Sequence, residues 1–277
     1  MLPPLNINKS RRVFLLAGGV SLGLMSSAFT APAQTDDPLA PALEAARRKR
    51  DPVQLESLKS QLEQRASQNP KDGASQYKLA LVESYLVDVA ESRKDKKTAI
   101  AALDKAIEAD QRAIQLDDKS ADAHSLLADL YGRKIGLGGG LFAGPRFGPK
   151  VGDENKRAIA LDNKNPHVWA STGRQHLMAP KAFGGDTARA IDSFKKSLTL
   201  DPNQDETWVW LAKAYERQSD KTNARDAIQH ALQLNPQSPS AQEASKSLGK
   251  VKTPEASAAP IGSEPLPKLR SDVSRID

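Results

Sequence analysis

The sequence predicts an all-α fold, a solenoid of stacked helical hairpins. Aromatic residues make up only 5% of the 277 residues, which suits helices that pack through small side chains. Apolar residues recur at helical spacing in similar units along the chain, and segments of one constant length join these units. Because one such hairpin cannot bury its apolar face alone, it must stack on its neighbours.

The clearest unit lies in residues 205–238. Its pattern is Trp208-x2-Leu211-Ala212-x2-Tyr215 in a first helix, then Ala224-x3-Ile228-x2-Ala231 in a second helix, then Pro236. These residue types and spacings resemble the tetratricopeptide repeat (TPR) family. The resemblance implies a right-handed superhelix that acts as a binding scaffold rather than as an enzyme.

Upstream units follow the same plan over residues 74–238, and we expect about four of them. The step from the end of one unit to the first large residue of the next is constant. It runs from Asp118 to His124, from Asn163 to Trp169 and from Pro202 to Trp208. The joints between hairpins are therefore strict, and length differences fall in the turns inside them.

Flanking segments complete the solenoid. Residues 38–72 form a degenerate N-terminal helix pair by pattern, in which Pro52 begins the second helix. Residues 239–249 form a capping helix that begins at Pro239. From residue 250 to residue 277 proline, serine, alanine and charge prevail without periodicity, so we expect a disordered tail.

Residues 1–33 have the pattern of an export signal. Lys9, Arg11 and Arg12 precede an apolar run over residues 13–25, and residues 31–33 supply a small-x-small cleavage site. Residues 10–15 also resemble the twin-arginine motif; a general secretory signal and an uncleaved anchor are the alternatives. We expect a periplasmic protein, exported by either route, with no integral membrane span after signal cleavage.

Composition excludes several classes of function. The signal carries three basic side chains and no acidic one, so the formal charge of +6 falls to +3 after cleavage. That charge is too weak to indicate nucleic acid binding. Cysteine is absent, which excludes a disulfide framework and a lipid-anchor cysteine. No histidine pair has metal-ligand spacing and no nucleophile elbow is present, so we expect no catalytic residues, metal or cofactor.

The geometry that the resemblance implies places a set of first-helix residues on a concave groove. These are Ser125, Asp129, Arg133, His167, Arg174, Val209, Lys213 and Arg217. The set is more basic than acidic, which favours a protein or peptide of acidic character as partner; ordinary solvated helix residues are the alternative. The Lys and Asn pattern that family members use to clamp a C-terminal carboxylate is missing.

Residues 136–152 are rich in glycine and predict an insertion in the turn of one hairpin. A phosphate-binding loop is disfavoured, because no Gly-Lys-Ser/Thr follows and no strand precedes it. We expect a loop folded over one edge of the solenoid. Its candidate functional residues are Phe142, Arg146, Phe147 and Lys150.

The sequence therefore indicates an exported scaffold or assembly factor that captures a partner peptide or surface in its groove. One alternative is a chaperone-like module for the maturation of an exported cytochrome or transporter component. Another, of a different class, is a small-ligand-binding protein or enzyme with a pocket under the glycine-rich segment.

Overall fold

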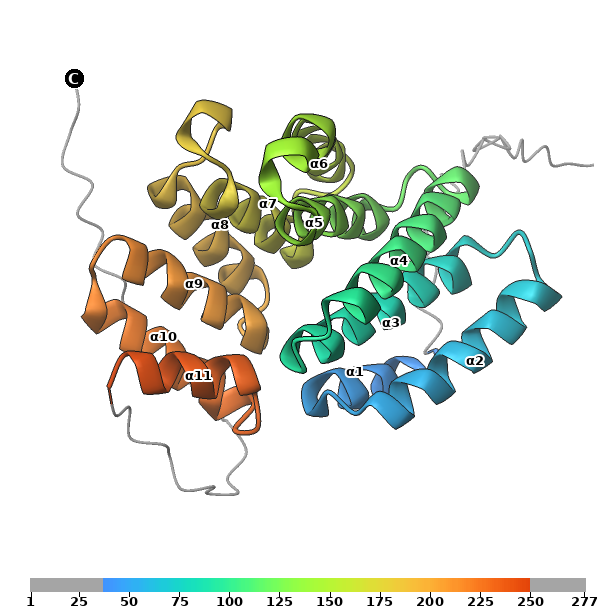
Figure 1. Cartoon of the computed structure of the whole chain (residues 1–277), viewed down its shortest axis with the longest axis horizontal. Coiled ribbons are helices and arrows are strands. Elements are labelled where there is room, and N and C mark those ends of the chain that lie inside the picture. Colours follow the sequence, from blue (N-terminus) through green and yellow to red (C-terminus); the bar gives the residue numbers. More distant parts are fainter. Residues whose placement is uncertain (1–36, 250–277) are drawn as a thin grey trace, which may run out of the picture. The chain divides into compact units, whose positions relative to one another are not determined.

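The structure, a computed structural model, describes residues 37–249, and within them the fold is all-α (Figure 1). Eleven α-helices and one 3-10 turn follow one another in this range, and it contains no strand. The helices are α1 (Ala40–Lys49), α2 (Pro52–Gln68), α3 (Gly73–Ser92), α4 (Lys96–Leu116), α5 (Ala121–Gly138), α6 (Gly140–Leu161), α7 (Pro166–Met178), α8 (Thr187–Leu200), α9 (Asp205–Arg217), α10 (Lys221–Leu234) and α11 (Pro239–Ser247), with the 3-10 turn η1 (Lys181–Phe183) between α7 and α8.

Four helical hairpins form the body of the described chain. They are α3–α4, α5–α6, α7–α8 and α9–α10, and each hairpin packs against the next. The predicted all-α fold of stacked hairpins is thereby confirmed. The predicted helix pair of residues 38–72 corresponds to α1 and α2, and the predicted capping helix corresponds to α11, which packs on α9 and α10.

The predicted export signal of residues 1–33 and the predicted tail of residues 250–277 lie outside the described residues. Both stay predictions. Across residues 37–249, no helix combines the length and the apolar character needed to cross a bilayer.

Short polar side chains begin most of these helices. Each occupies the N-cap position and accepts a hydrogen bond from a backbone N–H of the first turn, which satisfies a donor that the helix itself cannot pair. These N-cap residues are Asp51, Asp72, Asp95, Ser120, Asn165, Asp186, Asp220 and Ser238.

The joints between hairpins share one hydrogen bond, which explains their constant length. The indole Nε1 of Trp169 donates to the carbonyl of Asn163 at 2.7 Å, and that of Trp208 donates to the carbonyl of Pro202 at 2.9 Å. At the preceding joint, His124 Nε2 lies 3.1 Å from the carbonyl of Asp118. Each side chain reaches back six residues in sequence. A longer or shorter joint would move the carbonyl out of reach.

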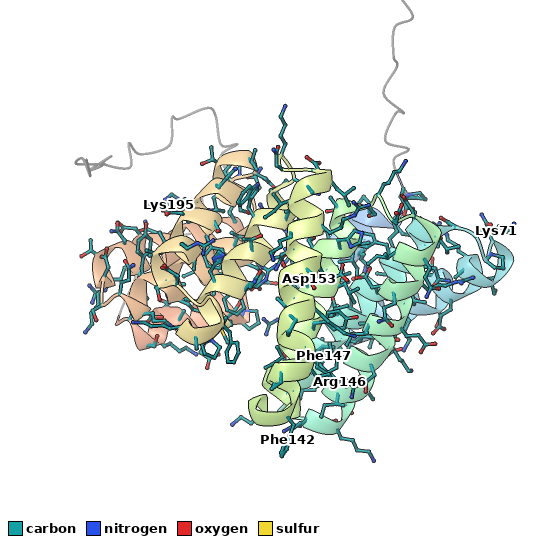
Figure 2. All side chains as sticks on the ribbon, turned by 90° about the horizontal axis from the view of Figure 1, so that it is seen from above. Lys71, Phe142, Arg146, Phe147, Asp153 and Lys195 are labelled. Atoms are coloured by element: carbon teal, nitrogen blue, oxygen red, sulfur yellow. The ribbon has the colours of Figure 1, made fainter. Side chains whose placement is uncertain are left out.

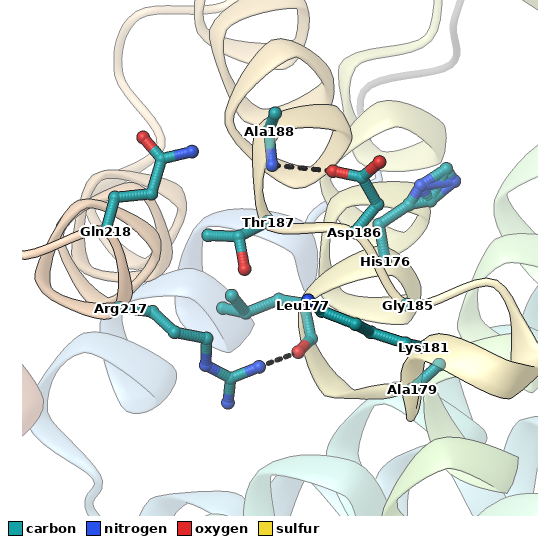
Figure 3. A pocket seen from close by; sticks show the side chains of 10 residues that line it. All are labelled: His176, Leu177, Ala179, Lys181, Gly185, Asp186, Thr187, Ala188, Arg217 and Gln218. Carbon is teal, nitrogen blue, oxygen red and sulfur yellow. Dashed lines mark hydrogen bonds between the residues drawn. The ribbon is translucent and has the colours of Figure 1, made fainter.

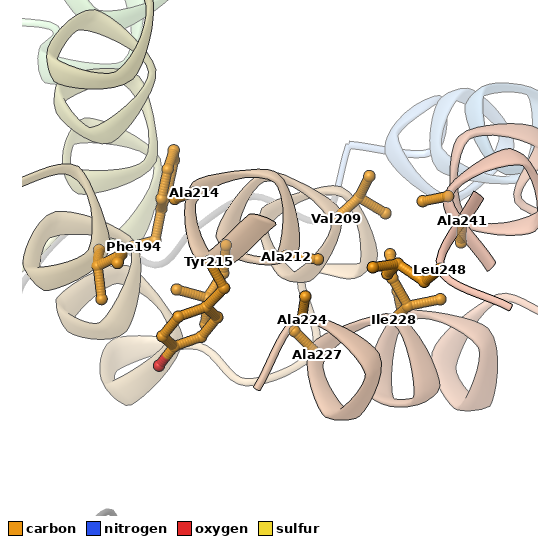
Figure 4. Close-up of a cluster of buried hydrophobic side chains, with 14 of the residues drawn as sticks. Phe194, Val209, Ala212, Ala214, Tyr215, Ala224, Ala227, Ile228, Ala241 and Leu248 are labelled. Carbon is orange, nitrogen blue, oxygen red and sulfur yellow. The ribbon is translucent and has the colours of Figure 1, made fainter. Parts of the chain in front are cut away.

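Small residues let the two helices of one hairpin approach closely. Phe194 of α8 is fully buried. A Cβ atom added to Gly173 of α7 would lie 2.5 Å from the Cε1 atom of Phe194. In the last hairpin, Ala212 of α9 and Ala224 of α10 are fully buried at the centre of an apolar cluster that reaches Leu248 (Figure 4). The spacing of small residues in the sequence thus sets the distance between paired helices.

The glycine-rich segment of residues 136–152 is helical, and its prediction as a loop is wrong. Helix α5 runs to Gly138 and α6 begins at Gly140, so Pro145 and Pro149 lie inside α6. The residue before a proline normally avoids the helical region because its Cβ atom and N–H meet the proline ring. Here Gly144 and Gly148 hold those places and have no Cβ atom, so the helix continues.

Helix α1 also contacts the last hairpin. The Arg47 guanidinium donates to Asp205 Oδ1 at 2.7 Å, and Asn235 Nδ2 donates to Asp205 Oδ2 at 2.8 Å. Arg48 Nη1 donates to the carbonyl of Leu234 at 3.3 Å. Asp205 is only 1% exposed. Because a buried carboxylate needs compensating donors, these contacts tie the first described helix to residues more than 150 positions away.

Substitution of Gly173 by alanine tests the close approach of α7 and α8. The new methyl group would collide with the buried Phe194 ring, so we expect the free energy of unfolding to fall by about 1–3 kcal/mol. Urea denaturation followed by circular dichroism measures this loss. Gly132→Ala is the matched control, because nothing lies within 4 Å of its added Cβ atom; it should stabilise the helix by about 0.5–1 kcal/mol. Equal effects of the two variants would contradict this explanation.

Candidate partner-binding surface

The residues predicted for the groove lie on three successive first helices. Helix α5 carries Ser125, Asp129 and Arg133, α7 carries His167 and Arg174, and α9 carries Val209, Lys213 and Arg217. We call the surface formed by these positions the first-helix face. Two of its predicted members do not reach solvent. Ser125 is 4% exposed and donates to the carbonyl of Asp122, and Val209 is 1% exposed in the apolar cluster of the last hairpin.

Arg133 binds the preceding first helix. Its guanidinium donates to the carbonyl of Ser84 at 3.1 Å and to Glu91 at 3.2 Å, and it also pairs with Asp88. All three partners belong to α3. The charge of Arg133 is therefore neutralised inside the chain, and its planar head links hairpin α5–α6 to hairpin α3–α4.

Arg174 and Asp129 neutralise each other in the same way. Arg174 Nε donates to Asp129 Oδ1 at 2.9 Å, and a second guanidinium nitrogen donates to Oδ2. Ser171 Oγ also donates to Asp129 Oδ1, at 2.9 Å. A two-point arginine–carboxylate pair fixes orientation as well as distance. It ties α7 to α5 and leaves neither charge free for a partner.

Arg217 extends the series to the last hairpin, where it donates to the carbonyl of Leu177 in α7. The arginines of α5, α7 and α9 thus each reach back to the preceding first helix. This use of the basic residues was not visible in the sequence, where they indicated only a basic groove. Their main contacts hold the hairpins together.

In the described range, two basic or titratable side chains of the first-helix face make no hydrogen bond or ion pair with the preceding first helix. Within the part of the chain that the structure describes, His167 and Lys213 are exposed and neither forms an ion pair. The Lys213 ammonium lies 4.3 Å from the ring centroid of Trp210, a cation–π contact. Met178, at the end of α7, adds an apolar side chain that is 62% exposed.

The four candidate residues of the glycine-rich segment separate into two groups along α6, and Figure 2 labels three of them, Phe142, Arg146 and Phe147. Phe147 packs against Tyr131 with ring centroids 5.4 Å apart. Arg146 lies over the Phe147 ring at 5.2 Å, and Lys150 lies over the Tyr131 ring at 5.2 Å. These three stabilise the hairpin. Phe142, at the beginning of α6, is 84% exposed.

His124, the first large residue of its unit, belongs to a polar contact. Its Nδ1 lies 2.6 Å from Glu154 Oε2. The hydrogen bond to Glu154 raises the pKa of His124 despite its burial. No group of three or more metal-ligating side chains occurs in residues 37–249. The contact joins α5 to α6.

Asp110 of α4 is a buried carboxyl group that the sequence did not single out. It is fully buried, and neither carboxyl oxygen has a hydrogen-bond partner among the described residues. Burial raises the pKa of Asp110 well above its usual value, and the nearby charge of Glu154 raises it further. A buried carboxyl without donors favours its neutral form.

A cavity of about 590 Å³ lies between the α7–α8 turn and the end of α9 (Figure 3). Sequence reasoning missed it, because its walls come from two hairpins. The only signal in the sequence is the glycine pair Gly184-Gly185 in the turn. The lining residues are His176, Leu177, Ala179, Lys181, Gly185, Asp186, Thr187, Ala188, Arg217 and Gln218.

Comparisons with known proteins agree with the fold. A family model described as a tetratricopeptide repeat matches residues 184–248. The solved structure of TTC0263, a thermophilic TPR protein in Thermus thermophilus, is similar over 75% of this chain and 97% of that chain, with 15% identity and a TM-score of 0.56. This likeness shows the fold. No curated protein matches the sequence.

Two further solved structures resemble the chain more weakly. MamA has 17% identity over 68% of this chain and 93% of its own, with a TM-score of 0.38. YrrB, described as a TPR protein with an unusual peptide-binding site, has 15% identity over 67% of this chain and 97% of its own, with a TM-score of 0.33. These two scores are too low to bear on the present chain.

Replacing Asp110 by asparagine should stabilise the protein, relative to the wild type, more at pH 8 than at pH 4. Below the ordinary pKa near 3.8, the carboxyl is protonated in both the folded and the unfolded chain. As pH rises toward the raised pKa of the folded state, only the unfolded chain ionises, so wild-type stability falls. Thermal melts of both proteins across this range measure the difference, with the exposed Asp226→Asn as control. A difference that does not grow with pH would contradict the assignment.

Proposed function

We propose that this chain, whose residues 184–248 belong to the tetratricopeptide repeat family and whose other described helices continue the same fold, is an exported protein-binding scaffold. It holds a partner peptide or surface on the first-helix face of α7 and α9. Stacked hairpins expose one extended surface made from successive first helices. The chemistry of that surface decides the partner.

The observation that carries the proposal is the contrast between tied and untied side chains on that face. The arginines are held by contacts within the chain, whereas Lys213, His167 and Met178 are exposed and keep their capacity for other contacts. A surface that offers an ammonium group on α9 and an exposed apolar side chain at the end of α7 suits an acidic segment that also carries apolar side chains. We therefore assign a partner of mixed acidic and apolar character to α7 and α9.

The place of action in this proposal is the periplasm. The supporting pattern is the charged and then apolar sequence of residues 1–33, followed by the small-x-small site at residues 31–33. A more specific role as an assembly or maturation factor for another exported protein is compatible with the same surface. Both roles require the same first step, capture of a partner segment on α7 and α9.

Site-specific photocrosslinking in cells tests this assignment. A photoreactive amino acid that replaces Lys213 of the full chain should give a covalent adduct with a second protein, because the proposed partner contacts this position. The same residue at Lys164, an exposed position in the joint between α6 and α7, serves as the control and should give none. The reversal of charge in Lys213→Glu should weaken co-purification of the same partner.

Two outcomes of the photocrosslinking experiment would contradict the proposal. Adducts of equal yield at residues 213 and 164 would indicate random collision. The absence of any adduct at residue 213, with the protein correctly exported, would remove α9 from the proposed binding surface. Mass spectrometry of the adduct identifies the partner segment.

A further inference from the structure

The cavity at the α7–α8 turn has walls that its own backbone fixes. Gly184 has φ +86°, a left-handed conformation that glycine adopts without strain. A Cβ atom at Gly185 would lie 1.8 Å from the carbonyl oxygen of Ala179, so only glycine fits there. The backbone N–H of Asp186 then donates to the carbonyl of His176 at 2.8 Å. The turn is therefore held in one shape before any ligand arrives.

Hydrogen-bond donors converge on this cavity from two hairpins. Figure 3 shows Lys181 and Arg217 reaching from opposite walls toward the same space, with the Thr187 side chain above them. Within residues 37–249, neither cation forms an ion pair. Arg217 donates to the carbonyl of Leu177, which engages part of a guanidinium with five N–H groups.

The single carboxylate in the lining does not neutralise these cations. Asp186 Oδ1 accepts from the backbone N–H of Ala188 at 2.8 Å and from that of Arg189 at 3.1 Å. It caps α8, and those hydrogen bonds lower the pKa of its carboxyl group. The cavity consequently presents an excess of positive charge that the described chain leaves uncompensated.

Two exposed apolar residues flank the lining residues in sequence, on the segment that forms one wall of the cavity. Met178 is 62% exposed and Phe183 is 75% exposed. They precede and follow the lining residues Ala179 and Lys181. A ligand that is only a small anion would gain nothing from these side chains, whereas a peptide with an apolar residue beside a carboxylate would use both.

We propose that this cavity binds a carboxylate group of the partner, with an adjacent apolar residue of the partner resting on Met178 and Phe183. Lys181 and Arg217 supply the charge, and the Thr187 hydroxyl supplies a further donor. The inference rests on the proposed function, since it names the part of the partner that the scaffold recognises. The carboxylate belongs either to an acidic side chain or to a peptide C-terminus.

The expected affinity of the carboxylate contact is modest. An exposed ion pair contributes about 0.2–1 kcal/mol, and both cations are accessible to solvent. Salt screens charges that are exposed to water. Binding should therefore weaken as ionic strength increases, while the apolar contacts are much less affected.

Fluorescence anisotropy with defined peptides tests the inference on the full chain. The first probe is a fluorescein-labelled, C-terminally amidated nonapeptide of three Gly-Leu-Asp units. The second replaces aspartate by asparagine and keeps a free C-terminus, and the third has asparagine and an amidated C-terminus. Binding of the first or the second probe, but not of the third, identifies a side-chain or a terminal carboxylate as the ligand.

The variant Lys181→Gln should weaken binding of the carboxylate probe about two- to fivefold. The Lys181 side chain makes no hydrogen bond or ion pair within the described residues, so its loss should not affect folding. Lys164→Gln removes the same charge at an exposed position outside the cavity and should leave the affinity unchanged. Equal affinity of Lys181→Gln and the wild type would overturn the inference, as would equal binding of all three probes.

A second measurement locates the ligand. His176 lines the cavity, and its Nδ1 is buried without a hydrogen-bond partner in the described chain. Burial lowers the pKa of His176, and the charge of Arg189 lowers it further. A carboxylate bound in the cavity should raise this pKa. Proton NMR follows each imidazole, and an unchanged His176 titration at saturating probe would place the ligand elsewhere.

The outcomes separate this inference from the proposed function. An adduct at residue 213 together with carboxylate-independent peptide binding would keep the scaffold and reject the carboxylate site. Carboxylate-dependent binding that Lys181→Gln weakens, without any adduct at residue 213, would keep the cavity and reject the proposed surface of α9.

Discussion

The described structure depends on the hydrogen bond that closes each joint between hairpins. In three successive joints, a ring nitrogen of a first helix meets the carbonyl six residues before it. The bond fixes where the next helix begins and how it is turned about its axis. Packing within each hairpin can then vary, because the register of the following hairpin is set at the joint rather than in the turn.

The arginine contacts use that fixed register. A side chain at a given place on one first helix always finds the previous first helix at a similar distance. Arg133 and Arg217 occupy the same place in their units, nine positions after His124 and Trp208, and reach carboxylates of α3 and the carbonyl of Leu177. Arg174 lies five positions after Trp169 and reaches Asp129 of the preceding first helix. Charge on the first-helix face therefore serves cohesion first. Recognition is left to the donors that these contacts do not use, such as the Lys213 ammonium and the remaining N–H groups of Arg217.

Much of the fold followed from the sequence, because it depends on local spacing. The periodicity of apolar residues gave the hairpins, and the repeated joint gave their stacking. The glycine-rich segment was misassigned because glycine and proline usually interrupt helices. The alternation of Gly144 with Pro145 and of Gly148 with Pro149 removes the clash between each proline ring and the Cβ atom of the residue before it, which composition alone does not indicate.

The candidate site was less accessible to sequence reasoning, since it depends on contacts between hairpins. Spacing assigned Arg174 to a face but could not show that Asp129 lies within hydrogen-bond distance. The cavity at Lys181 and Arg217 joins residues from two units, and its shape follows from a turn of unusual length. To predict such features one must know the distance between helices of different hairpins, and the residue spacing within one unit does not give that distance.

The contact of Arg47 with Asp205 changes how such an array loses its structure. An open stack of repeats frays from its terminal units, because an end helix is held from one side only. Here a helix near the beginning and the hairpin near the end hold one another through a buried carboxylate. If either element detached, the Asp205 carboxylate would lose hydrogen-bond donors. We therefore expect the two terminal elements to melt together rather than one after the other.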